Sequence, residues 1–193
     1  AVNDYLTTLA GRMKDRNLAR LVTNTLPNTL DTTVASFDFG DTFIITGDIN
    51  AMWLRDSCNQ VLPYMRFIKQ DPHLESMLQG LVMRMTRSVL LDSYANAFNF
   101  DSSEATEHME DVRNPPMTNA TFEGKYELDS LAAFLKLSRS VYAQSDTLFD
   151  DDEDYLLWLK AVDRVVETIM RQQMSTSEEE ESREGAAYTF ERL

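Results

Sequence analysis

The chain has 193 residues, 43% of them hydrophobic, which is enough apolar material for one globular domain with a proper core. Its 32 acidic and 18 basic residues give a formal net charge of −14, so a nucleic-acid partner is not expected, because such a surface repels a phosphate backbone. No stretch approaches the roughly 20 apolar residues that span a bilayer, and no membrane partner is expected either.

Six glycines and five prolines are few for this length, and frequent Leu, Met, Ala and Arg favour a mostly α-helical chain. Apolar residues at helical spacing predict a first helix over residues 4–22, with Asp4 as a possible cap. Residues 32–49 change to short β-like runs broken by glycines, which predicts a hairpin or an extended loop. A second helix is predicted over residues 55–69.

The most regular element is the third helix, which begins at Asp71 and a following proline and carries apolar residues at helical spacing over 74–89. A long polar connection over 93–125 separates it from a fourth helix that begins near Leu128. A fifth helix is predicted over 151–173, because its acidic first turn lies where the helix dipole favours negative charge.

The acidic run over residues 175–186, which includes STSEEEESRE, is of low complexity and is predicted to be a solvated loop. Long and short connections alternate between the predicted helices. Because successive loops of antiparallel helices fall at alternate ends of a stack, both long connections should lie on one rim. Loops over a rigid scaffold commonly carry binding groups, so we expect a site on this rim.

Trp53, Arg55 and Asp56 stand together at the end of the first long connection. An aromatic ring can stack on the C–H face of a pyranose, and charged side chains can bind paired hydroxyl groups, so these residue types suit a sugar site. From the residue types alone, a structural interpretation is also open and is slightly favoured. In it, Asp56 caps the second helix, Arg55 forms a structural ion pair and Trp53 lies in the core.

Glu127 and Asp129 open the fourth helix, at the end of the second long connection. Neighbours two apart on a helix diverge by about 200°, so we expect these carboxyl groups to face different ways. One could cap the helix, and the other, if burial keeps it protonated, could act as general acid toward a leaving alcohol. Asn96 and Asn99 could bind hydroxyl groups without adding charge, or could stabilise the loop as Asx turns.

His73 and His108 are the only histidines, and neither has a histidine or cysteine at ligand spacing, so no metal site and no cofactor are predicted. The signatures GxSxG, GxGxxG and the Walker loop are absent from the sequence. The single cysteine, Cys58, has apolar neighbours and is expected to be a small buried residue rather than a reactive thiol.

Three motifs, GDINAMWLRDSCNQVLPY, YANAFN and KYELDSL, follow one another in the order and spacing of glycoside hydrolase family 125, the metal-independent exo-α-1,6-mannosidases. The chain resembles this family from about Phe43 to Leu137, with a weaker similarity at YTFERL. The resemblance implies an (α/α)6 helical barrel, of which this chain supplies about half. Residues 1–193 would be the N-terminal part of one catalytic domain, completed by a C-terminal remainder, for instance on a second chain.

By the same resemblance, the reaction is the removal of terminal α-1,6-linked mannose from a glycan with inversion of configuration. A general acid and a general base flank the bond in such a mechanism, about 6.5 to 9.5 Å apart. Asp129 matches the family's acid, and the base is a glutamate in the C-terminal remainder. The resemblance assigns substrate contacts to five residues: Arg55 and Asp56 on the mannose hydroxyls, Trp53 and Asn96 as pocket-shaping residues, and Glu127 in the site wall.

Two positions depart from the family's pattern: Gly124 stands where a basic residue usually precedes the lysine, and Ala132 stands where cysteine is frequent. The acidic run is similar to an insertion in fungal members, which favours a eukaryotic source. A secreted or secretory-pathway location is favoured over the cytoplasm. Two alternatives stay open: a barrel that binds mannose-containing glycans without cleaving them, and a hydrolase of this architecture that acts on another glycan.

Overall fold

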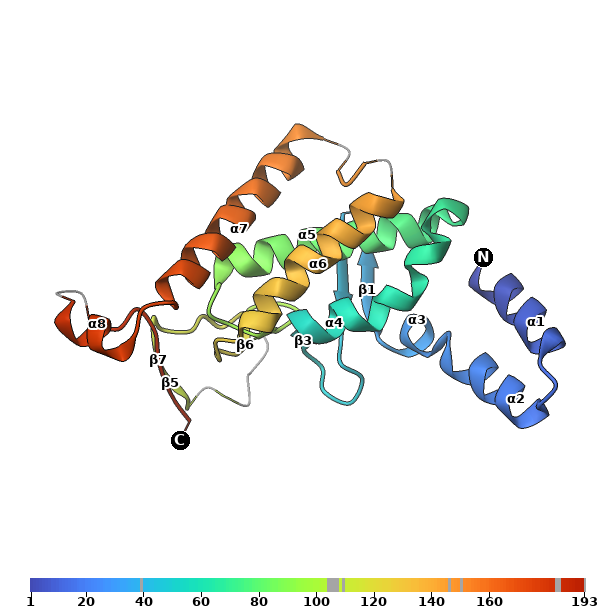
Figure 1. Ribbon diagram of the computed structural model, residues 1–193, viewed down its shortest axis with the longest axis horizontal. Helices are drawn as coiled ribbons and strands as arrows, with labels where there is room; N and C mark the ends of the chain where they lie inside the picture. Colours follow the sequence, from blue (N-terminus) through green and yellow to red (C-terminus); the bar gives the residue numbers. More distant parts are fainter. Residues whose placement is uncertain are drawn as a thin grey trace.

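The computed structural model describes residues 1–38, 40–103, 108, 110–145, 147–149, 151–182 and 185–192. This described part is mostly helical, as predicted (Figure 1). Its helices are α1 (Val2–Arg12), α2 (Arg16–Thr25), α3 (Asn28–Thr32), α4 (Leu54–Val61), the 3₁₀ helix η1 (Leu62–Gln70), α5 (Pro72–Leu91), α6 (Leu128–Gln144), α7 (Asp152–Arg171) and α8 (Thr176–Glu181). Its strands are β1 (Val34–Asp38), β2 (Asp41–Ile44), β3 (Met52–Trp53), β4 (Ala97–Phe98), β5 (Val112–Asn114), β6 (Thr121–Glu123) and β7 (Thr189–Glu191).

Four helices form the body of the fold as two pairs that run out and back, α4 with α5 and α6 with α7 (Figure 1). Equivalent helices of the two pairs are neighbours, because α4 packs on α6 and α5 packs on α7. A helical barrel repeats this arrangement around a ring. The core between the pairs includes Leu54, Leu78, Phe134 and Cys58. Burial raises the pKa of the Cys58 thiol to about 11, as expected for an unreactive buried cysteine.

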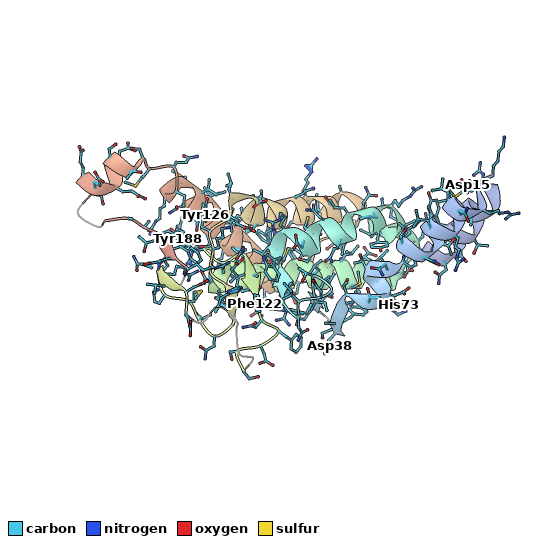
Figure 2. The ribbon with its side chains drawn as sticks, turned by 90° about the horizontal axis from the view of Figure 1, so that it is seen from below. Asp15, Asp38, His73, Phe122, Tyr126 and Tyr188 are labelled. Carbon is cyan, nitrogen blue, oxygen red and sulfur yellow. The ribbon has the colours of Figure 1, made fainter. Side chains whose placement is uncertain are left out.

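The predicted hairpin is present and packs against α5, with Asp38 at the end of β1 (Figure 2). β1 and β2 pair antiparallel, with Asp38 opposite Asp41 across a turn that contains Gly40. Gly40 has a φ of 77°, which glycine adopts without steric cost. Phe43 and Ile44 of β2 are buried against the core, and β2 lies along α5. The hairpin therefore covers one side of the third predicted helix.

The predicted single helix over residues 4–22 is wrong, because this segment forms two helices, α1 and α2. α1 ends at Arg12, and the following Met13 has extended backbone. Asp15 begins the second helix, since its carboxylate accepts hydrogen bonds from the backbone N–H groups of Asn17 and Leu18. The apolar residues continue at helical spacing through residues 13–15, but the cap at Asp15 starts a new helix there.

Two further elements differ from expectation in type rather than in place. The helix predicted over 55–69 is α-helical only to Val61, because Pro63 has no N–H group to donate to the preceding turn, and η1 continues the chain. In the acidic run, residues 176–181 form α8 instead of a loop. Ser175 and Glu178 make a capping box that begins it, and the segment is largely exposed, as expected. Residues 183 and 184 of the run lie outside the described residues.

Gly80 allows α5 to lie directly on β2. A Cβ atom at this position would lie 2.7 Å from the Thr42 hydroxyl oxygen and 3.1 Å from the backbone nitrogen of Asp41. We expect Gly80→Ala to lower the free energy of unfolding by about 1–3 kcal/mol, although alanine favours helices. Gly11→Ala in α1 is the matched control, because no described atom beyond its chain neighbours and its own helix backbone lies within 4 Å of its Cβ position. We expect it to stabilise by up to about 1 kcal/mol. Thermal unfolding measures both, and a higher Tm for Gly80→Ala would contradict this packing.

Candidate active site at the helix starts

The two long connections meet in a small sheet at the starts of α4 and α6. Its strand order is β3-β4-β6, with Trp53 opposite Ala97 and Ala97 opposite Glu123. This arrangement confirms that both connections end on one rim. Asn99 joins the two ends of the segment between β4 and β6, because its backbone N–H donates to the carbonyl of Ala120 and its amide donates to that of Asn119. Asn99 is therefore a loop-stabilising residue.

Arg55, in the first turn of α4, is the centre of the site. Its guanidinium donates to Oε2 of Glu127 at 2.6 Å and to Oδ2 of Asp129 at 3.2 Å, and its Nε lies 3.5 Å from Oδ1 of Asp56. Burial alone would lower the pKa of Arg55, but the charges and hydrogen bonds of Glu127 and Asp129 outweigh it and raise this pKa. A permanent cation thus gathers three carboxyl groups, and we call Arg55, Asp56, Glu127 and Asp129 the arginine cluster.

Both carboxyl groups of the α6 start face Arg55, so the expected divergence of Glu127 and Asp129 is wrong. Glu127 is the residue before the helix and has extended backbone, with φ −135° and ψ 118°, so the angular rule for two helical residues does not apply to it. Its carboxylate makes no capping bond to the backbone within the described chain, and it accepts from the Ser130 hydroxyl at 3.1 Å instead. The simple capping role is therefore not observed for Glu127.

Asp129 is more exposed than the sequence suggested. Its side chain is 61% exposed, whereas that of Glu127 is 19% exposed. The described residues therefore leave this carboxyl group open to solvent. An open position beside a guanidinium is one that a glycan oxygen can reach.

Trp53 and Asn96 support the cluster from the sheet. Trp53 packs outside the main core, with its ring 5.2 Å from that of Phe122. Asn96 is 1% exposed. Its side-chain NH₂ donates to Oε2 of Glu123 at 2.6 Å, and its backbone carbonyl accepts from the N–H of Leu54, the first residue of α4. The Asn96 side-chain oxygen is buried without a hydrogen-bond partner in the part of the chain described. Asn96 thus ties the sheet to the helix that carries Arg55.

Glu123 is a residue that the sequence reasoning missed. Burial would raise its pKa, but hydrogen bonds from Arg192 and Asn96 outweigh burial and lower it. Arg192 belongs to the YTFERL stretch and also lies 3.4 Å from Asp111. The weaker family similarity of this stretch could have drawn attention to Arg192, but no local pattern links it to Glu123.

A buried ion pair supports the long connection behind the sheet. Asp92 and Arg113, whose side chains are 5% and 1% exposed, lie 2.7 Å apart. Asp92 also accepts from the Thr121 hydroxyl and the Tyr94 N–H. Arg113 and Met117 pack closely against Gly124. A Cβ atom at Gly124 would lie 3.1 Å from the guanidinium of Arg113 and 2.3 Å from the sulfur of Met117. The absence of a side chain at Gly124 therefore makes room for this packing.

Within the described ranges, no group of three or more His, Cys, Asp or Glu side chains is arranged to hold a metal ion. The described helices also include none that is long and apolar enough to cross a membrane.

Paired helices that pack side by side, with an arginine and carboxyl groups at one rim, are the arrangement expected for a portion of a helical barrel. A sequence model of the family described as metal-independent alpha-mannosidase (GH125) matches residues 15–193. The chain belongs to this family, and the resemblance inferred from the three motifs is confirmed.

Two relatives show how much of such a protein is present. The meiotically up-regulated gene 157 protein of Schizosaccharomyces pombe is 36% identical over 192 residues, which cover 93% of this chain and 36% of that protein. A Streptococcus pneumoniae structure from a study of metal-independent alpha mannosidases, solved as a non-productive complex with alpha-1,6-mannobiose, superposes with a TM-score of 0.81 at 31% identity. The match covers 99% of this chain and 42% of that one, so the chain spans about two fifths of a helical-barrel protein.

Proposed function

We propose that this chain carries the general acid and part of the mannose site of an exo-acting α-1,6-mannosidase that inverts configuration and needs no metal. The observation that carries the proposal is the arginine cluster, in which one guanidinium holds Glu127 and Asp129 at the rim where α4 and α6 begin. Family membership and the likeness to a protein solved with alpha-1,6-mannobiose support the choice of substrate.

In the proposed reaction, Asp129 donates its proton to the glycosidic oxygen as the bond from that oxygen to C1 of mannose breaks. A water molecule attacks C1 from the opposite face and gives its proton to a general base outside this chain. Arg55 and Asp56 bind hydroxyl groups of the terminal mannose, and Glu127 forms part of the wall. Trp53 shapes the pocket, whereas Asn96 acts through the sheet, because its side chain is buried.

The remainder of the domain is the proposed partner of this chain. Several apolar side chains on α6 and α7 are about half exposed or more, and a barrel would cover them with further helix pairs: Leu128, Tyr142, Leu156, Val166 and Met170. We also propose a secreted or secretory-pathway location, which is compatible with exposed Asn119 in an Asn-Ala-Thr sequon.

The test is an assay of the complete protein with α-1,6-mannobiose, with and without a chelator. We expect chelator-resistant release of mannose, with little release from α-1,2-mannobiose under the same conditions. Proton NMR of the first turnovers should show β-mannose, because inversion at C1 of an α-mannoside gives the β anomer. Initial α-mannose would contradict the inverting mechanism, and binding without release would favour a glycan-binding barrel.

A further inference from the structure

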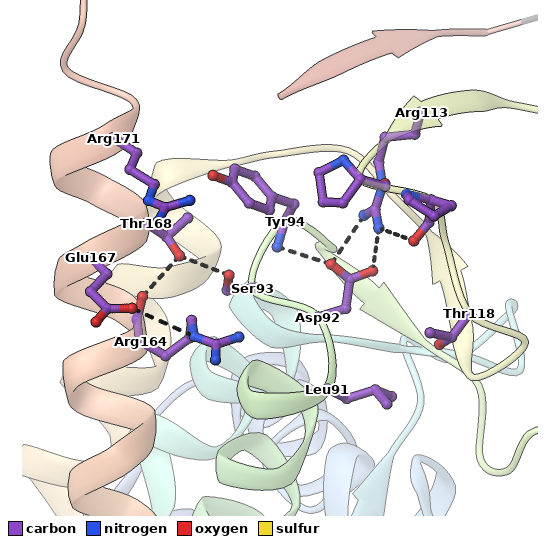
Figure 3. A pocket seen from close by; sticks show the side chains of 12 residues that line it. Leu91, Asp92, Ser93, Tyr94, Arg113, Thr118, Arg164, Glu167, Thr168 and Arg171 are labelled. Atoms are coloured by element: carbon purple, nitrogen blue, oxygen red, sulfur yellow. Dashed lines mark hydrogen bonds and ion pairs between the residues drawn. The ribbon is translucent and has the colours of Figure 1, made fainter. Parts of the chain in front are cut away.

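A separate cavity of about 400 Å³ lies between the end of α5 and the C-terminal half of α7, and none of the arginine cluster lines it (Figure 3). This volume is in the range of small-molecule sites in proteins. Five charged side chains line it: the three arginines Arg113, Arg164 and Arg171, and the two acids Asp92 and Glu167. Three positive against two negative charges leave an excess of one positive charge, on a chain whose net charge is −14.

On the wall formed by Arg113, every N–H donor of the guanidinium already has an acceptor. Its five N–H donors are used on Asp92, which takes two, and on the carbonyl groups of Pro115, Pro116 and Gly124. Arg113 and Asp92 therefore neutralise one another and have no donor left for a ligand. The free positive charge of the cavity must come from α7.

The α7 wall contains two arginines that make fewer contacts with acceptors than Arg113 does. Arg164 lies 3.8 Å from Glu167 and is 47% exposed. Arg171 has no carboxylate partner among the described residues. Both project from α7 toward the side on which Ser93 and Tyr94 lie (Figure 3). A guanidinium presents paired N–H groups that match the oxygens of a phosphate or carboxylate.

Tyr94 supplies the second observation that indicates a ligand. Its side chain is only 9% exposed, and its hydroxyl oxygen is buried without a hydrogen-bond partner in the described ranges. The ring is fixed by stacking on Tyr188, with centroids 5.2 Å apart, and its hydroxyl end points toward α7 (Figure 3). Buried hydroxyl groups are normally paired, so this one is placed to donate to a group that occupies the cavity.

We propose that this cavity binds a small ligand through a phosphate-type oxyanion, held by Arg164 and Arg171 and by the hydroxyl of Tyr94. The ligand is either free phosphate or a phosphate ester on a sugar, since both carry the same oxyanion. The site is distinct from the mannose site and does not depend on the mannosidase reaction.

The experiment is calorimetric titration of the complete protein with inorganic phosphate and with mannose 6-phosphate, with excess mannose present to occupy the mannose site. Both probes are expected to bind more weakly as salt is added, because the contacts are ionic. Tighter binding of mannose 6-phosphate would identify a phosphorylated sugar as the ligand, and equal or tighter binding of phosphate would identify the free ion. If neither probe binds, the proposal is overturned.

Three variants test the residues. Arg171→Gln should weaken binding about tenfold, as expected for the loss of a charged hydrogen bond. Tyr94→Phe should weaken binding about threefold to tenfold without lowering the Tm of the ligand-free protein, because the hydroxyl has no hydrogen-bond partner among the described residues. Arg20→Gln, an exposed position on α2, makes the same change in net charge and should leave binding unchanged. Equal weakening by Arg171→Gln and Arg20→Gln would overturn the site.

Discussion

Asp129→Ala should reduce the hydrolysis of α-1,6-mannobiose by the complete protein about 10³-fold, because the leaving oxygen then departs without its proton. The fold should survive, since this side chain is 61% exposed and its ion pair with Arg55 is shared with Glu127. Initial rates and thermal unfolding measure the two effects separately.

A substrate that needs no protonation makes this prediction specific to a general acid. Dinitrophenyl α-mannoside releases dinitrophenolate, a stable anion that needs no protonation, so the rate deficit of Asp129→Ala should shrink to a small fraction of the mannobiose deficit. Asp163→Ala, an exposed carboxylate on α7, is the matched control and should have near-normal rates with both substrates. Equal deficits on both substrates would assign Asp129 to binding rather than to proton transfer.

Asp92→Ala should lower the free energy of unfolding by about 3–5 kcal/mol, the largest stability effect that we expect in this chain. The variant leaves the guanidinium of Arg113, which is 1% exposed, without its counter-charge. It also removes the acceptor for the Thr121 hydroxyl and the Tyr94 N–H, so the long connection before α6 loses its anchor. Thermal or urea unfolding of the complete protein measures the loss.

Two companion variants separate a buried pair from an ordinary one. Arg87→Ala removes an ion pair to Asp41 in which the arginine is 48% exposed, and we expect it to cost about 0–1 kcal/mol. Asp92→Leu combined with Arg113→Met should be less destabilising than Asp92→Ala, because no charge is left buried. If Asp92→Ala lowers the free energy of unfolding no more than Arg87→Ala does, the Asp92–Arg113 pair is not shielded from water.

The third, fourth and fifth helices could be placed from the sequence, because each has a long apolar stripe, and the third also has a strong start signal at Asp71 and Pro72. The first helix could not, because Leu18 and Leu21 continue the period of the residues before them. These two side chains are 47% and 57% exposed, so their helical spacing does not mark a buried face. A local capping bond at Asp15 decided the outcome instead.

The sequence predicted which residues lie at the ends of the two long connections, and therefore which rim they share. It did not predict the directions of individual side chains or the partners they bind. Alternating loop lengths placed Arg55 and Asp129 on one rim, although 74 positions separate them. The direction of Glu127 depends on its extended backbone before α6, which spacing rules for helices do not cover. The pair of Glu123 with Arg192 joins residues 69 apart, and no local pattern indicates such a partner.

The closure of the segment between β4 and β6 by Asn99 has a consequence for how the family can diversify. The chain leaves the sheet at Asn99 and returns at Ala120, and a hydrogen bond of 2.9 Å joins these two points. Insertions in the exposed stretch at 100–103, away from the buried Arg113, should change the loop without changing the register of β4 and β6, and their entropic cost grows only slowly with length. Related chains can therefore differ in the length of this loop while the residues at the starts of α4 and α6 keep their positions.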